Sequence, residues 1–147
     1  MDEAAITEYI LNTFDDVEAF TTEGVTFFFY DPEQKFPFAT LVTQDNDYDR
    51  ASNLDRPTVF RLNIGVSPDT YQSMFGPRPK RAGESGAVDT GHDFTALDEL
   101  MPHPVYAPMS WICVLNPSPE TFEAVRPLLA EAYQLDVAKH TRRASRY

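Results

Sequence analysis

Four segments with β-strand character follow one another over residues 17–66, and no helical pattern separates them. Helices that alternate with strands are the mark of a doubly wound parallel sheet, so this run of neighbouring strands excludes that class. We therefore predict an α+β domain: a mainly antiparallel sheet of about five strands, with helices packed on one face. The predicted strands are 17–20, 25–30, 38–43, 59–66 and 111–115.

Three further segments carry helix signals. Apolar residues recur at i, i+3, i+4 and i+8 from Ile6 to Phe14, which gives one apolar stripe. Ser67 and Ser118 each precede a proline, a typical helix start. Pro127 lies inside the last of these helices and should kink it, because proline lacks an N–H. We expect helices at 3–14, 68–76 and 118–138, and a short helical turn at 96–100.

Length, charge and cysteine content restrict the class of protein. The chain has 147 residues, a formal net charge of −11 and one cysteine. One domain at residues 1–138 is expected, followed by a basic, flexible tail at 139–147. The lone cysteine, the acidic amino terminus and the short apolar runs favour a cytoplasmic protein without a signal peptide or membrane span. An acidic body repels phosphate backbones, which argues against nucleic-acid binding.

Several motifs resemble those of a known family. The segments LDRPTVFRLNIGV, HDFTALDELMPHPVYAPMSWICVLNPS and VRPLLAEAY are similar to a family of small bacterial proteins of unknown function. The similarity spans about Ile6 to Tyr133. The order of elements, with a strand Trp before a final helix ending in Ala-Tyr, also looks distantly like the MmcQ/YjbR domains. That resemblance implies a small α+β fold and, through a link proposed for those domains, weak nucleic-acid binding.

The segment 59–66 carries the main candidate site. Apolar residues alternate there with Arg61 and Asn63, which predicts one buried face and one more polar face. If neighbouring strands place Thr26, Phe28 and Tyr30 on the polar side, the face combines aromatic area with fixed donors, as recognition surfaces do. The alternative is an ordinary solvated sheet face. Polar segments 44–57 and 77–93, with the Pro-rich stretch 101–109, are expected to rim this face.

Other candidate ligand-binding residues flank this strand. Arg56 could hold a carboxylate or phosphate, or could simply pin its own loop. Tyr106 and Trp111 could supply apolar contact, or could cap the edge of the core. His92 and His103 could include a general base, although no nucleophile accompanies them in the sequence. The histidines and Cys113 match no zinc spacing, so we expect no metal and no cofactor.

These observations favour a non-enzymatic binding module. Arg56, Arg61 and Asn63 would hold an anionic or amide-bearing group of an unknown small molecule or protein. A small-molecule enzyme with a histidine base is one alternative, and weak nucleic-acid binding through the tail is another. The sequence leaves a monomer or a homodimer open, since an exposed strand edge could pair with a second copy.

Overall fold

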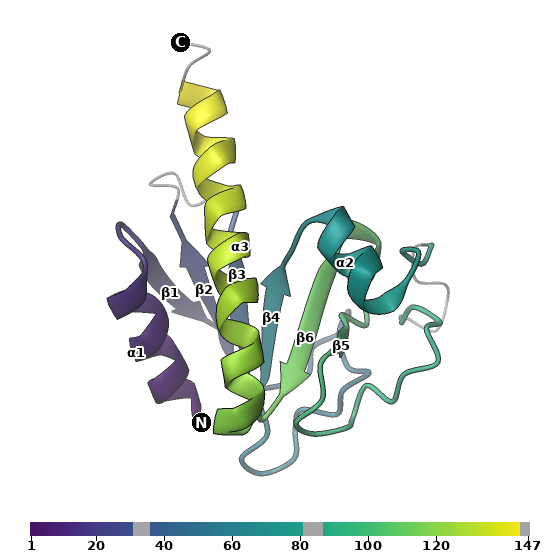
Figure 1. Ribbon diagram of the computed structural model, residues 1–147. Coiled ribbons are helices and arrows are strands. Elements are labelled where there is room, and N and C mark those ends of the chain that lie inside the picture. The colour runs from purple at the N-terminus through teal and green to yellow at the C-terminus, as the bar shows by residue number, and fades with distance from the viewer. Residues whose placement is uncertain (31–35, 81–86, 145–147) are drawn as a thin grey trace.

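The computed structural model describes residues 1–30, 36–80 and 87–144. It is an α+β fold with three helices on one face of a six-stranded sheet (Figure 1). The strands are β1 (Glu18–Thr22), β2 (Val25–Phe29), β3 (Ala39–Val42), β4 (Arg61–Gly65), β5 (Met101–Pro102) and β6 (Trp111–Leu115). The helices are α1 (Glu3–Thr13), α2 (Pro68–Phe75) and α3 (Pro119–Ala144), with a short 3-10 helix η1 (Ala107–Met109). This confirms the predicted fold class.

The sheet is antiparallel throughout, in the order β1-β2-β3-β4-β6-β5. Its register places Phe27 beside Thr40, Thr40 beside Asn63, and Asn63 beside Cys113. Side chains of antiparallel neighbours share a face, so these four lie on one side of the sheet. The opposite side carries the residues between them in each strand.

The main core lies between the sheet and its helices. Phe28, Leu41, Leu62, Ile64 and Val114 point from the strands toward the helical side and are at most 2% exposed. Helix α1 adds the apolar stripe that its spacing predicts, and α3 adds the residues Phe122, Val125 and Leu129. Figure 1 shows α1 and α3 side by side over this face.

Each helix begins at a polar cap. Asp2 accepts from the N–H of Ala5 at 2.8 Å, Ser67 from Thr70 at 3.1 Å, and Ser118 from Thr121 at 3.2 Å. These bonds satisfy backbone donors that a helix cannot satisfy internally. The predicted helix starts at Ser67 and Ser118 are therefore confirmed.

Helix α3 differs from its predicted extent. It continues to Ala144, six residues beyond the predicted end, so most of the expected tail is helical. Lys, Arg and Ala are good helix formers, and extending a formed helix is easier than starting one. The helix also continues through Pro127. Residues 145–147 lie outside the described residues.

The segment before β6 also differs from expectation. The predicted turn at 96–100 is not helical, because Asp98 has a φ of 59° and its carboxylate accepts from Ser118 N–H at 2.7 Å. The Pro-rich stretch instead forms the short strand β5 and the helix η1. A two-residue strand containing proline gives no alternation to detect, which is why it was not among the predicted strands.

Long loops partly cover the second face of the sheet. A smaller apolar cluster forms there from strand residues and from Leu54 and Val59 of the loop before β4. Its strand members are Val42, Met101, Cys113 and Leu115. This loop layer leaves the central part of the face, near β2 and β3, open, and the candidate site lies in that opening.

Candidate functional site

A pocket of about 850 Å³ opens on the loop-covered face of the sheet. Strands β2, β3 and β4 supply part of its lining through Phe27, Thr40 and Asn63. The turn between β1 and β2, the loops after β3 and β5, Pro37 before β3 and Trp111 of β6 also contribute lining residues. The pocket therefore lies where the polar face of the 59–66 strand was predicted, between two of the three expected rims.

A buried polar cluster supports the floor of this pocket. The Arg61 guanidinium is fully buried and forms a two-pronged ion pair with Asp49, whose Oδ1 lies 3.0 Å from Nη1. Arg61 Nη1 also donates to Ser52 Oγ at 2.9 Å, and Nε donates to Asn63 Oδ1 at 2.8 Å. A buried charge requires such partners, because the cost of removing it from water is otherwise unrecovered.

The cluster extends from Arg61 toward the pocket. Asn63 Nδ2 donates to Thr40 Oγ1 at 2.9 Å, and both residues line the pocket. Because Arg61 holds Oδ1 of Asn63, the amide orientation is fixed with its NH₂ toward Thr40. Arg61 thus positions Asn63 from below rather than contacting a ligand itself.

His103 is the second polar group of the floor, and its tautomer follows from its contacts. Its Nδ1 accepts from the backbone N–H groups of Val105 and Tyr106, both at 3.0 Å. A nitrogen that accepts two N–H bonds carries no proton, so the neutral ring has its proton on Nε2. Burial lowers the pKa of His103 well below its ordinary 6.5, and the nearby Arg61 charge lowers it further. His103 is therefore a neutral Nε2–H donor at pH 7.

Among residues 1–30, 36–80 and 87–144, the His103 Nε2–H has no acceptor within hydrogen-bond distance. Arg61 Nη2 lies 3.3 Å away but is itself a donor, so this contact is no hydrogen bond in the assigned tautomer. Asp49 Oδ2 lies 4.0 Å away, beyond hydrogen-bond reach. The imidazole is 2% exposed and lines the pocket, so an acceptor that enters the pocket could meet this proton.

Aromatic and sulfur-containing side chains form the walls. Tyr48 is 83% exposed, Met109 68% and Tyr106 50%, and all three line the pocket together with Phe27 and Trp111. The Tyr106 ring lies 4.9 Å from the His103 ring, centroid to centroid. Single exposed apolar side chains are common, but several gathered around one pocket are typical of a binding surface.

Gly65 allows the Trp111 ring to lie close against β4. A Cβ built on Gly65 would lie 3.0 Å from two atoms of that ring, closer than ordinary contact. The glycine therefore has a packing role next to the pocket, in a strand where glycine is otherwise unfavourable.

Four of the predicted site residues line the pocket: Asn63, His103, Tyr106 and Trp111. Arg61 is adjacent but entirely buried and already paired, so its expected role as a direct ligand contact is wrong. The prediction placed the side chain on the correct face but did not include the loop that covers it. The short spacing of acids in 44–57 could have suggested Asp49 as its partner.

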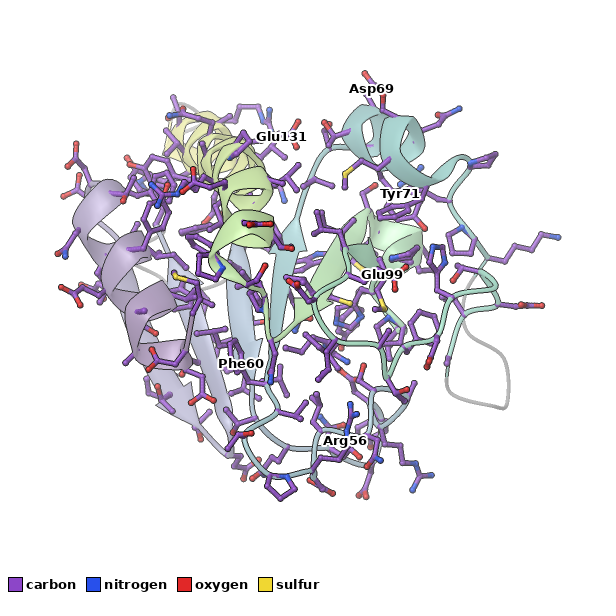
Figure 2. The ribbon with its side chains drawn as sticks, turned by 60° about the horizontal axis from the view of Figure 1, so that its bottom comes forward. Arg56, Phe60, Asp69, Tyr71, Glu99 and Glu131 are labelled. Atoms are coloured by element: carbon purple, nitrogen blue, oxygen red, sulfur yellow. The ribbon has the colours of Figure 1, made fainter. Side chains whose placement is uncertain are left out.

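Arg56 and His92 lie outside the pocket lining. Arg56 donates to the carbonyls of Asn53, Ser52 and Thr95 at 2.8 to 3.1 Å, which joins the loop before β4 to the loop before β5. The alternative interpretation of Arg56 was a salt bridge to a nearby acid that pins its loop; Arg56 does pin the loop, but through backbone carbonyls. Figure 2 shows Arg56 among the loops below the sheet. His92 contacts Thr90 and the ring of Phe75 on α2 instead.

The aromatic partners of the face were assigned to the wrong side of β2. Thr26 pairs with Leu41 on the helical side, Phe28 is buried in the main core, and Tyr30 packs edge-on against Tyr133 of α3. The aromatic residue of β2 that lines the pocket is Phe27 instead. Sequence alternation sets which residues share a face within one strand, but the register between strands decides which faces coincide.

The structure describes only part of the third expected rim, residues 77–93. Val88 of the 77–93 segment is buried in the main core, and residues 81–86 lie outside the described residues. Tyr48, Asp49 and Met109 are among the lining residues that sequence reasoning did not single out.

Among the described residues, no group of three or more His, Cys, Asp or Glu could hold a metal ion. No helix in the described part of the chain is long and apolar enough to cross a membrane.

The fold and the site together define a class: a one-sided α+β sheet whose second face carries a loop-walled pocket. The chain belongs to the family of unknown function DUF6194, whose model matches residues 1–145. A crystal structure of a protein from Pseudomonas syringae is similar at 14% identity and a TM-score of 0.48, over 92% of this chain and 99% of that one. No curated protein matches. The resemblance to MmcQ/YjbR domains stays a prediction.

Proposed function

We propose that this protein is a binding module that takes a small molecule into the pocket on the loop-covered face. Small-molecule sites typically measure ~300–1,000 Å³ and combine apolar walls with a few placed polar groups. The pocket of about 850 Å³ meets both conditions. The observation that carries the proposal is the buried His103 side chain of the pocket lining, whose Nε2–H is a fixed donor without an acceptor among the described residues.

The floor is organised without any ligand. Asp49, Ser52 and Asn63 hold Arg61, Arg61 orients Asn63, and two backbone N–H groups orient His103. A ligand that binds to such a floor loses little free energy to ordering of the protein. This supports binding as the role of the cluster, beyond its contribution to stability.

The same geometry weakens the case for a histidine general base. A base needs a free lone pair, but Nδ1 of His103 is occupied by two N–H donors and Nε2 carries the proton. His92 is not among the lining residues. No serine or cysteine in the described part of the chain lines the pocket, so a nucleophile of that kind is missing as well.

Trp111 offers a direct test because it is the single tryptophan of the chain and lines the pocket. A thermal-shift screen against a metabolite library should yield compounds that raise the melting temperature, since a ligand that prefers the native state stabilises it. Those compounds should also change Trp111 fluorescence with the same concentration dependence.

Two variants locate the binding. Tyr48→Ala and Tyr106→Ala remove exposed wall residues and should weaken the hits about tenfold, whereas Leu11→Ala on the helical face should leave them unchanged. Hits that bind all three variants equally, or a library without a compound that alters Trp111 emission, would contradict the proposal.

A further inference from the structure

We infer that the ligand is an organic cation that also carries a carbonyl, with the carbonyl oxygen at the His103 floor and the cationic group at the mouth. This inference deepens the proposed binding function and rests on it. It follows from the distribution of charge, aromatic surface and hydrogen-bond donors around the pocket.

The mouth of the pocket is negatively charged. Glu23 and Asp47 are among the residues that line the pocket, both are exposed, and neither forms an ion pair within the described residues. Asp49 also lines the pocket, but Arg61 offsets its charge. No Lys or Arg lines the pocket in residues 1–30, 36–80 and 87–144. The formal net charge of −11 adds to this field, which attracts cations and repels anions.

Two arginines that contact pocket residues or their neighbours, Arg61 and Arg78, are already bonded within the protein. Arg61 is buried against Asp49, and Arg78 donates to Pro108 O at 3.3 Å, behind the segment that carries Met109. An anionic ligand would therefore meet exposed acidic residues in the pocket lining and, within the described part of the chain, no Lys or Arg among the lining residues. Of the two expected ligand groups, we therefore favour the amide-bearing group over the anionic group.

Aromatic walls suit the same ligand class. Tyr48, Tyr106, Trp111 and Phe27 surround the opening, and an ammonium or guanidinium over an aromatic face is attracted by the negative face of the ring. Acidic groups beside such rings add a second attraction of the same sign. A neutral apolar ligand would contact the aromatic rings but would gain no attraction from the carboxylates of Glu23 and Asp47.

The floor supplies the other half of the recognition. The His103 side chain is buried and belongs to the pocket lining, and its Nε2–H has no acceptor within hydrogen-bond distance in the described part of the chain. Thr40 Oγ1 accepts from Asn63, which leaves the Thr40 hydroxyl proton for a further acceptor. A carbonyl oxygen can accept from either donor, whereas a second cationic group could accept from neither. The floor therefore favours a carbonyl oxygen and the mouth favours a cationic group, so we expect one ligand to carry both at opposite ends.

A matched pair of probes tests the charge requirement. N-acetyl-L-argininamide and N-acetyl-L-citrullinamide have nearly the same shape and the same amide carbonyls, but only the first is a cation. In titrations followed by Trp111 fluorescence, the arginine compound should bind at least tenfold more tightly. The difference should shrink as salt rises, because exposed charges are screened.

The double variant Glu23→Gln/Asp47→Asn tests the mouth. It should weaken binding of the arginine compound about tenfold, since two nearby charges contribute a few-fold each in water, and should leave the citrulline compound unaffected. The control Glu8→Gln/Glu123→Gln removes two exposed carboxylates from the helical side and should change neither affinity.

Three results would overturn the inference: equal binding of the two probes, tighter binding of anionic N-acetyl-L-aspartate, or no Trp111 response to the arginine compound at millimolar concentration. None of these would by itself refute the binding function, because the metabolite screen judges that separately. A library hit that is neutral or anionic and depends on Tyr48 and Tyr106 would retain the pocket and reject the cation.

Discussion

At the scale of single residues, the most consequential contact is the buried pair of Arg61 and Asp49. Arg61 is fully buried, and the Asp49 side chain is 12% exposed. Removing one member of such a pair leaves the other charge without compensation, which typically costs ~3–5 kcal/mol. The pair also fixes the floor through Asn63.

We expect Asp49→Ala to lower the free energy of unfolding by about 3 kcal/mol or more. Asp47→Ala, two residues away and exposed, should change it by less than about 0.5 kcal/mol. Urea unfolding followed by circular dichroism measures both values. Similar values for the two variants would show that Arg61 does not depend on Asp49.

His103 links stability to pH. Its folded-state pKa lies well below 6.5, so between these two values the unfolded chain binds a proton that the folded chain does not. Stability is therefore full above about pH 6.5 and falls as the pH drops toward the folded-state pKa. Asp93 and Asp98 have pKa values lowered from 3.8 by hydrogen bonds from Thr95 and Ser118, so neither titrates between pH 5 and 6.5.

The variant His103→Asn tests this linkage, because its Oδ1 can still accept from Val105 and Tyr106. Between pH 6.5 and 5, the wild type should lose stability more steeply than the variant, by up to about 1.4 kcal/mol per pH unit. Urea midpoints at several pH values give the slopes. Parallel slopes would mean that His103 titrates normally in the folded protein.

At the scale of elements, the contact between α3 and α2 is specific. Glu131 of α3 accepts from Thr70 Oγ1 at 2.5 Å, beside the Ser67 cap of α2, and Figure 2 shows Glu131 on the side of α3 that meets α2. Glu131→Ala should destabilise the protein by about 1–2 kcal/mol, whereas Glu123→Ala, which breaks an exposed pair on the same helix, should cost under about 1 kcal/mol. Thermal unfolding measures the loss of stability in each variant. Equal shifts in melting temperature would contradict a role of Glu131 in supporting the cap of α2.

Sequence reasoning at this scale succeeded where periodicity is strong. It located the strand around Arg61 and Asn63 and the strand that begins at Trp111, because alternation and β-forming residues mark both. It missed β5, which is too short for a period, and it ended α3 too early. It also misplaced Thr26, Phe28 and Tyr30, because one strand's alternation does not state its register against the next.

At the scale of the whole molecule, the two faces of the sheet have different roles. One face packs on helices in a continuous apolar core, and the other carries loops, a small apolar cluster and the pocket. The sequence indicated a polar face with Asn63, His103, Tyr106 and Trp111 near it. It could not indicate Tyr48 or the burial of Arg61, since both depend on how the loop after β3 folds back.

Cys113 reports on the integrity of this second face. Its thiol is buried in the smaller cluster, and burial raises its pKa to about 12. Only the thiolate reacts readily, so the native protein should resist a thiol reagent at pH 8 and become labelled only on unfolding. The time course of labelling with a chromogenic disulfide measures the reactivity of Cys113. Rapid labelling in native buffer would show that the loop layer opens without unfolding.

The central claim is that the pocket floor is a preformed donor surface, with His103 neutral and its proton on Nε2. Nitrogen-15 NMR of the imidazole side chains measures this directly. The account predicts a His103 Nε2 signal typical of a protonated nitrogen and an Nδ1 signal typical of a bare one, unchanged from pH 8 to pH 6. A proton on Nδ1, or an imidazolium at neutral pH, would contradict it.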